Sequence, residues 1–262
     1  MLATQILKKV VLASIAFGAF ATTNMVARAA PLAVTFAPSV VVAGASNFTA
    51  DKLNLLNYSR VDLTGTTFTE NGYLQINNAS LNNNVFDPTG NRSAYSLYLD
   101  YTAAGVQSAP NFNSTSTGTI SSLSYILYET PGASSFGING VNQAFVTNAT
   151  APTALATGSL IAGTTSFSVN PLGAGANVDA TFIQSLAGFI VSPANAALSL
   201  HGAFNNDSQI VSVLNGGTAF TLNGGGGDLT FTATTSVPEP ASMALLGSGL
   251  ISLGFVRRRN RR

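Results

Sequence analysis

The chain has 262 residues, contains no cysteine and carries a formal net charge of +1, with only 8% of its residues charged. Eight of its eleven basic residues lie in the first 28 or the last six positions, so residues 30–236 keep three basic and nine acidic residues, a net charge of −6. This composition excludes disulfide and thiol chemistry, argues against nucleic-acid binding, which needs a basic patch, and fits one large domain.

The first 29 residues have the three parts of a secretory signal peptide in the expected order. Two lysines, at positions 8 and 9, supply the positive region, and an apolar stretch over residues 10–21 is too short for a stable membrane span. Ala27 and Ala29 then give the small-x-small pattern of a cleavage site. We therefore predict a signal helix that is removed by cleavage after Ala29.

Residues 30–232 show the alternation of apolar and polar side chains that is typical of β-strands. The stretches "YSLYLDY" (95–101) and "SLSYILYE" (122–129) each place tyrosine and leucine side chains on one face. The sequence therefore predicts a single all-β domain, an antiparallel β-sandwich of which a jelly roll is one form. Residues 233–240 follow this domain as a stalk.

Turns and loops are predicted from glycine and from polar stretches. Asn-Gly pairs, which favour tight hairpin turns, occur at residues 71–72, 139–140 and 215–216. Four glycines at 224–227 predict a flexible hairpin loop between two strands. The polar stretches 77–84 and 111–122 are likewise predicted to be loops.

Few residues of the body are suited to catalysis or metal binding. His201 is the only histidine, there is no G-x-S-x-G motif, and the His and Cys ligands of a zinc site are missing. We therefore predict no catalytic residue, no metal site and no cofactor. A calcium site is the alternative left open, and its oxygen ligands would come from Asp87, Asp100, Asn205, Asn206 and Asp207. The same residue types are typical of turns.

Tyr98 and Tyr128 are candidate glycan contacts because each falls opposite the expected core face of its strand. The alternative is that both side chains pack on a second face of the sheet. A glycoside hydrolase would instead need two carboxyl groups at a suitable separation, and Glu70 and Glu129 are among the candidates.

The C-terminal residues combine three elements. Pro238, Glu239 and Pro240 keep the chain extended before an uncharged stretch, residues 241–256. As a helix this stretch is roughly 24 Å long, close to the ~30 Å hydrocarbon core of a membrane. The tail then holds five arginines that the positive-inside bias retains in the cytoplasm: Arg257, Arg258, Arg259, Arg261 and Arg262. Residues 241–262 are therefore predicted to be a transmembrane sorting helix with an Arg-rich tail.

This order of elements resembles the PEP-CTERM sorting signal of Gram-negative bacteria. The resemblance implies recognition by an exosortase, a membrane-embedded cysteine transpeptidase that removes the tail, and an association with exopolysaccharide production. Stretches of the body such as "FTADKLNLLNYSRVDL" and "LSLHGAFNND" also resemble flocculation-associated PEP-CTERM proteins. That likeness implies a link to cell aggregation within a polysaccharide matrix.

The sequence thus predicts an exported, non-enzymatic protein held transiently in the inner membrane and then delivered to the cell surface or extracellular matrix. There it would act as a structural or adhesive protein that promotes aggregation, flocculation or biofilm formation. Its expected partners are an exosortase and exopolysaccharide or other matrix components. Two alternatives stay open: a carbohydrate-binding module, with or without calcium, and a secreted glycoside hydrolase or lyase.

Overall fold

The computed structural model describes residues 31–89, 94–148, 150–169, 172–194, 198–206 and 209–233. The predicted signal peptide, with Ala27 and Ala29, and the predicted PEP residues, transmembrane helix and arginines lie outside these ranges. Within them, no helix combines the length and the apolar character that crossing a bilayer requires.

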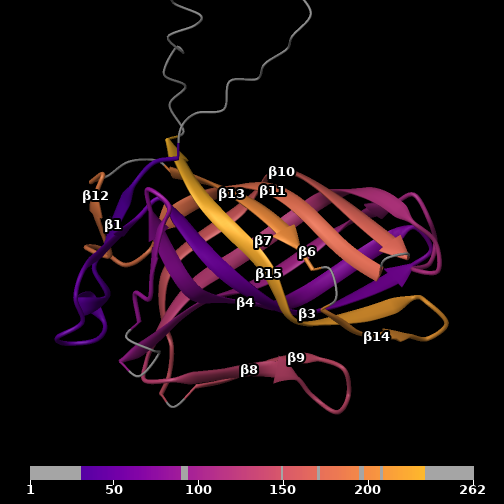
Figure 1. The fold of residues 1–262 in the computed structure, drawn as a ribbon, viewed down its shortest axis with the longest axis horizontal. Coiled ribbons are helices and arrows are strands. Elements are labelled where there is room, and N and C mark those ends of the chain that lie inside the picture. The colour runs from indigo at the N-terminus through magenta and orange to yellow at the C-terminus, as the bar shows by residue number, and fades with distance from the viewer. Residues whose placement is uncertain are drawn as a thin grey trace, which may run out of the picture. The chain divides into compact units, whose positions relative to one another are not determined.

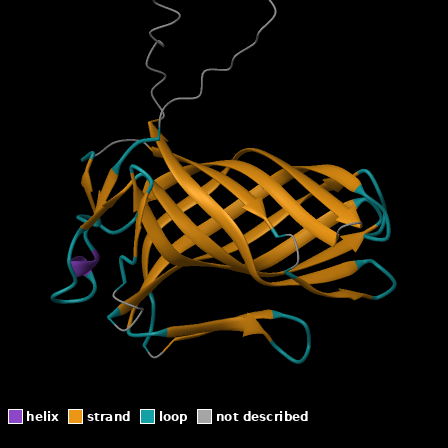
Figure 2. Cartoon of the chain, in the orientation of Figure 1, coloured by secondary structure: helices purple, strands orange, loops and turns teal. Residues whose placement is uncertain are grey.

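The described chain is built almost entirely of β-strands (Figure 2). The main sheet has ten strands, including the short β5 (Asn84–Phe86) and β14 (Ile210–Leu214), and its eight long strands are β3 (Lys52–Thr64), β4 (Thr67–Leu81), β6 (Tyr95–Gln107), β7 (Ser116–Pro131), β10 (Thr153–Val169), β11 (Leu172–Gln184), β13 (Leu198–Asn205) and β15 (Ala219–Ala233). The other short elements are β1 (Val34–Phe36), η1 (Pro38–Val40), β2 (Phe48–Ala50), β8 (Ser134–Ile138), β9 (Ala144–Asn148) and β12 (Ile190–Ser192).

The eight long strands close into an antiparallel barrel (Figure 1). Their order is β13-β11-β10-β7-β6-β4-β3-β15, and β15 pairs back with β13 from Leu198 opposite Ala233 to Asn205 opposite Gly226. The prediction of an all-β antiparallel domain is confirmed, whereas the sandwich and the jelly roll are wrong. Alternation could not separate these folds, because inward and outward side chains alternate along the strands of both.

Apolar side chains fill both ends of the barrel. At one end the small sheet of β1, β2 and β12 places Phe36 with its ring centroid 5.5 Å from that of Phe231 in β15. At the same end the N–H group of Leu32 donates to the carbonyl of Phe231 at 2.8 Å. At the other end Phe112, from the connection between β6 and β7, packs 4.8 Å from Phe167 and 4.5 Å from Phe220.

The glycine tract at residues 224–227 is not a hairpin loop, because it lies inside β15 and residues 225–227 pair with β3. A Cβ atom added at Gly227 would lie 2.4 Å from the ring of Phe204, and one at Gly225 would lie 1.8 Å from Oδ1 of Asn206. The glycines therefore leave room for two side chains that cross the strand, and they do not form a loop.

The other turn and loop predictions had mixed outcomes. The pairs at 139–140 and 215–216 do lie at turns, between β8 and β9 and between β14 and β15. The pair at 71–72 lies in the middle of β4, where a Cβ on Gly72 would be 2.5 Å from that of Ser59. Much of the two predicted polar loops is strand, since β4 continues to Leu81 and β7 begins at Ser116.

Close strand contacts make Gly158 in β10 intolerant of a side chain. An added Cβ would lie 2.0 Å from the carbonyl oxygen of Thr181 and 2.4 Å from the ring of Tyr125. We expect Gly158→Ala to lower the free energy of unfolding by about 1–3 kcal/mol, measured by urea denaturation. Gly140→Ala is the control, because nothing lies within 4 Å of its added Cβ. Equal denaturation midpoints for the two variants would contradict this packing.

Candidate functional site

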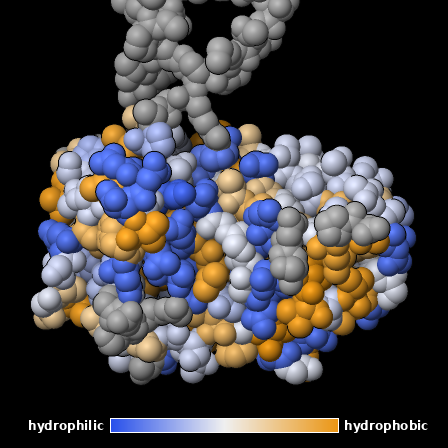
Figure 3. Space-filling view, viewed as in Figure 1, coloured by the Kyte–Doolittle hydropathy of each residue, from blue (hydrophilic) through white to orange (hydrophobic). Residues whose placement is uncertain are grey.

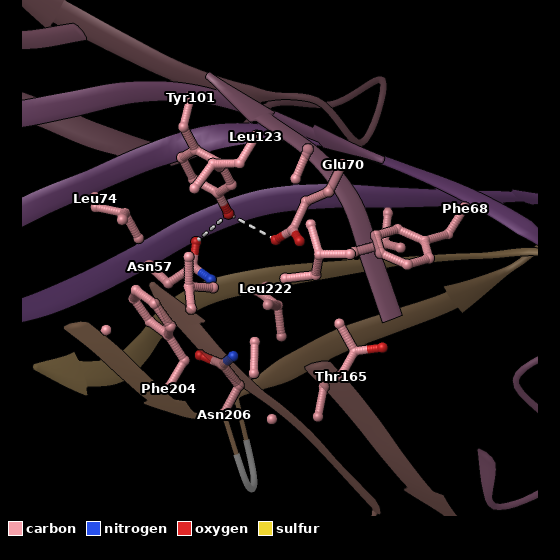
Figure 4. A pocket seen from close by; sticks show the side chains of 18 of the residues that line it. Asn57, Phe68, Glu70, Leu74, Tyr101, Leu123, Thr165, Phe204, Asn206 and Leu222 are labelled. Atoms are coloured by element: carbon pink, nitrogen blue, oxygen red, sulfur yellow. Dashed lines mark hydrogen bonds between the residues drawn. The ribbon is translucent and has the colours of Figure 1, made fainter. Parts of the chain in front are cut away.

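A cavity of about 100 Å³ lies inside the barrel and is lined by residues from all eight strands (Figure 4). It exists because several inward positions carry small residues where a leucine would fill the space: Ala103, Ala174, Ala176, Ala180 and Gly202. Larger apolar side chains, among them Leu99, Leu123 and Leu222, form the rest of the wall. The cavity therefore offers a mainly apolar surface inside an otherwise packed domain.

One side of this cavity carries a polar cluster of Asn57, Ser59, Glu70 and Tyr101. The Tyr101 hydroxyl lies 2.6 Å from Oε1 of Glu70 and 3.0 Å from Oδ1 of Asn57 (Figure 4). The Ser59 hydroxyl donates to the same oxygen of Glu70 at 2.8 Å. Three of these groups come from neighbouring inward positions of β3 and β4, and Tyr101 reaches them from β6.

The number of hydrogens in this cluster bears on the charge of Glu70. Tyr101 has one hydroxyl hydrogen but faces two acceptor oxygens, on Glu70 and Asn57. A protonated Glu70 supplies the second hydrogen, because it can donate to Tyr101 while Tyr101 donates to Asn57. Burial raises the pKa of Glu70 above its ordinary value, against the opposing effect of these hydrogen bonds, and so favours the protonated form.

Glu129 is a second carboxyl group inside the barrel. Its side chain is 0% exposed, and neither carboxyl oxygen has a hydrogen-bond partner among the described residues. Burial raises the pKa of Glu129 to about 8. Glu70 of β4 lies opposite Ala103 of β6, and Glu129 of β7 lies opposite Leu97 of the same strand. At ~3.3 Å per residue, these two positions of β6 are about 20 Å apart along the strand. That exceeds the ~5–10 Å between the two carboxyl groups of most glycoside hydrolases.

His201 lies on the outer wall of the barrel and not in the cavity. Its Nδ1 atom is 2.6 Å from Oδ1 of Asp179, which faces it across β11 and β13. The other ion pairs of the described residues, Lys52 with Asp228 and Arg60 with Asp62, also join outward positions of the barrel strands. None of these pairs includes Glu70 or Glu129, so the interior carboxyl groups have no described cationic partner.

The two tyrosines predicted as glycan contacts differ in accessibility. Tyr98 is 2% exposed because the β8–β9 hairpin covers it, with Phe136 at 5.5 Å between ring centroids and Asn148 donating to its hydroxyl at 2.9 Å. Its ring therefore has no open face for a sugar. Tyr128 is half-buried beside Tyr98 and stays a candidate.

The residues proposed for calcium do not gather at one place. Asp87 follows β5 and accepts hydrogen bonds from the N–H and hydroxyl groups of Thr89, as turn residues do. Asp100 lies in the middle of β6, whereas Asn205 and Asn206 are at the end of β13, and residue 207 lies outside the described ranges. Among described residues no group of three or more His, Asp or Glu side chains could hold a metal ion.

Sequence reasoning missed the polar cluster and Phe112, although the cluster left a signal. Asn57 and Ser59 occur in phase with Leu53, Leu55 and Val61, so polar side chains sit on the apolar face of their strand. A polar residue on a core face indicates a buried hydrogen-bond network. Phe112 left no comparable signal, because a single aromatic residue in a polar stretch does not show where it packs.

A family model, the PEP-CTERM protein-sorting motif, matches residues 236–262. This range contains Pro238, Glu239, Pro240 and all five terminal arginines, so the predicted sorting signal is confirmed. No curated protein and no solved structure matches the chain. The cleavage site at Ala27 and Ala29 stays a prediction.

The burial of Glu129 should make stability fall with rising pH. Its pKa is raised from 4.5 to about 8, so the folded chain binds the proton more tightly than the unfolded chain. The resulting contribution is present below pH 4.5 and is lost as the pH rises to 8. A tenfold difference in proton affinity corresponds to ~1.4 kcal/mol. Between pH 4.5 and 8, the free energy of unfolding of the wild type should therefore fall by several kcal/mol relative to that of Glu129→Gln.

Denaturant titrations of both chains at pH 4.5, 6 and 8 measure this difference. Asp51→Asn is the control, because it makes the same carboxyl-to-amide change at a partly exposed position. Parallel pH profiles for wild type and Glu129→Gln would contradict the burial of an ionisable group at this position.

Proposed function

We propose that this chain is an exported, non-catalytic protein of the cell surface or extracellular matrix that promotes cell aggregation, flocculation or biofilm formation. The sorting motif at residues 236–262 is the observation that carries this proposal. It implies a secreted protein whose C-terminal signal resides transiently in the membrane and is processed by an exosortase.

The proposed route uses each end of the chain once. The signal peptide directs export, and the apolar stretch at 241–256 then stalls in the inner membrane. The terminal arginines hold that stretch in place because moving them across the bilayer is costly. Cleavage near Glu239 releases the barrel on the outer side, where exopolysaccharide is the proposed partner.

The outer wall of the barrel supports a role in contact with a neutral matrix. Hydroxyl groups of neighbouring strands pair across it, as for Ser199 with Thr232 at 2.7 Å and Thr102 with Ser124 at 3.0 Å. Residues 30–236 contain only three basic and nine acidic residues, so most polar atoms on this wall are neutral. Such a surface can exchange hydrogen bonds with sugar hydroxyls without needing charged partners.

Carbohydrate binding is the second candidate, favoured by one observation. Tyr73 and Tyr128 are both half-buried and both pack against Tyr98 on the outside of the barrel. Their remaining exposed ring surface could stack on a sugar. Binding of the host's exopolysaccharide that Tyr128→Ala abolishes would favour this candidate over a purely structural role.

Deleting residues 237–262 tests the proposed processing. We expect the deleted chain to show no processing step by intact mass spectrometry and to be missing from its normal location. The full chain in a host without its exosortase is the matched control, and it should keep its tail and stay in the membrane. Extracellular protein that still carries Arg262 would contradict the proposal.

Cell sedimentation tests the proposed aggregation. A host that lacks this protein should settle more slowly than the wild type. The full chain should restore settling, and the chain without residues 237–262 should not. If settling is the same with and without the protein, the aggregation role is wrong, even where processing occurs as expected.

A further inference from the structure

We propose that the barrel interior is a binding site for a small, neutral, largely apolar molecule with one hydroxyl group, such as a short-chain or single-ring alcohol. This site is separate from the outer surfaces invoked above, and it does not depend on the proposed aggregation role. Four features of the interior support it: an unfilled volume, a polar cluster, an amide oxygen with no described partner and an interrupted wall.

The unfilled volume is the first feature. An eight-stranded barrel has an interior that is either filled by its own side chains or able to hold one small ligand. Here the two ends are packed with phenylalanine and leucine, but the middle keeps a cavity of about 100 Å³. That is of the same order as an apolar cavity of about 150 Å³ known to bind benzene.

The polar cluster sets the ligand chemistry. Glu70 keeps part of its surface accessible although it points into the barrel, so its carboxyl group borders the cavity (Figure 4). Because the acid hydrogen of protonated Glu70 already bonds to Tyr101, the group offers its other carboxyl oxygen as an acceptor to a ligand hydroxyl. No described ion pair supplies a cation here, so an anionic ligand would be buried without compensation.

A second polar group borders the cavity on another wall. The side chain of Asn206 is only 4% exposed, and its Oδ1 atom has no hydrogen-bond partner among the described residues. Figure 4 shows Asn206 pointing into the cavity from the side opposite Glu70 and Tyr101. A buried amide oxygen without a partner is costly, and a ligand hydroxyl would relieve that cost once the amide turns from Gly225, against which Oδ1 now lies, toward the cavity.

The wall next to Asn206 is interrupted. β13 pairs with β15 only as far as Asn205, and beyond that point β14 takes its place beside β15. No pairing joins β14 to β11 within the described residues. Two exposed valines lie on β14, Val211 at 59% and Val213 at 42%, in the region where Figure 3 shows hydrophobic residues gathered. The N–H group of Asn206 still donates to the carbonyl of Ala174 in β11 at 2.8 Å, but the described residues form no ladder between β14 and β11 that an entering apolar molecule would have to break.

Three single-ring probes separate the chemical classes: benzyl alcohol, toluene and benzoate. The protein is expressed as the full chain and purified in its processed form, and each probe is titrated into it by calorimetry. Benzyl alcohol should bind saturably. Toluene should bind more weakly, because it leaves Asn206 and Glu70 without a new partner. Benzoate should not bind, because its charge would be buried. Failure of benzyl alcohol to saturate, or tighter binding of benzoate, would overturn the proposal.

Two variants locate the binding. Ala180→Leu fills the cavity and should weaken benzyl alcohol binding at least tenfold, whereas Ala162→Leu, the same change on the exposed side of β10, should leave it unchanged. Tyr101→Phe should weaken benzyl alcohol several-fold and leave toluene unaffected. Equal affinity in wild type and Ala180→Leu would place the ligand elsewhere and overturn the proposal.

Methyl NMR of the wild-type protein gives a test that needs no variant to fold. Benzyl alcohol should shift the methyl signals of Leu99, Leu123 and Leu222, which line the cavity. The methyl signals of the exposed Val85 and Val141, which lie away from β14, should not move. Shifts confined to the exposed valines would show surface binding only, and the proposal would be wrong.

Discussion

The pairing of β13 with β15 is the constraint on which the rest of the structure depends. Eight consecutive residue pairs, from Leu198 opposite Ala233 to Asn205 opposite Gly226, join the two edges of what would otherwise be an open sheet. An open sheet would leave two rows of unpaired backbone groups and an exposed apolar face. Because the pairing joins those edges, the inward residues of eight strands share one interior, and the cavity and its polar cluster are consequences of that closure.

The interior combines apolar packing with buried polar groups that oppose stability. Glu129 has no described partner, and Glu70 is held by hydroxyl and amide groups inside the wall. Natural cores keep such groups only where their hydrogen bonds are satisfied or where they serve a function. The two acids differ in this respect. Glu70 borders open space within reach of a ligand, whereas Glu129 is enclosed by side chains.

The strands were predictable from sequence because alternation is a local property, and the runs at 95–101 and 122–129 both lie in barrel strands. The closure of the barrel was not predictable from sequence, because it depends on pairing between segments far apart in the chain. The glycines at 224–227 misled for the same reason, since the side chains they accommodate, Phe204 and Asn206, belong to another part of the chain. The cavity needs small residues from several strands at one level, and no single stretch reveals that. The sorting motif was predictable because its elements are contiguous.

The contact between Leu32 and Phe231 brings the first and last parts of the described barrel together. The barrel pairings themselves run from Lys52 to Ala233, so all of their described partners lie between these two residues. Proteolytic trimming of either terminus therefore removes none of the strand pairings of the barrel. A molecule built in this way can be matured in two separate cuts, in either order, while its strand pairing stays intact.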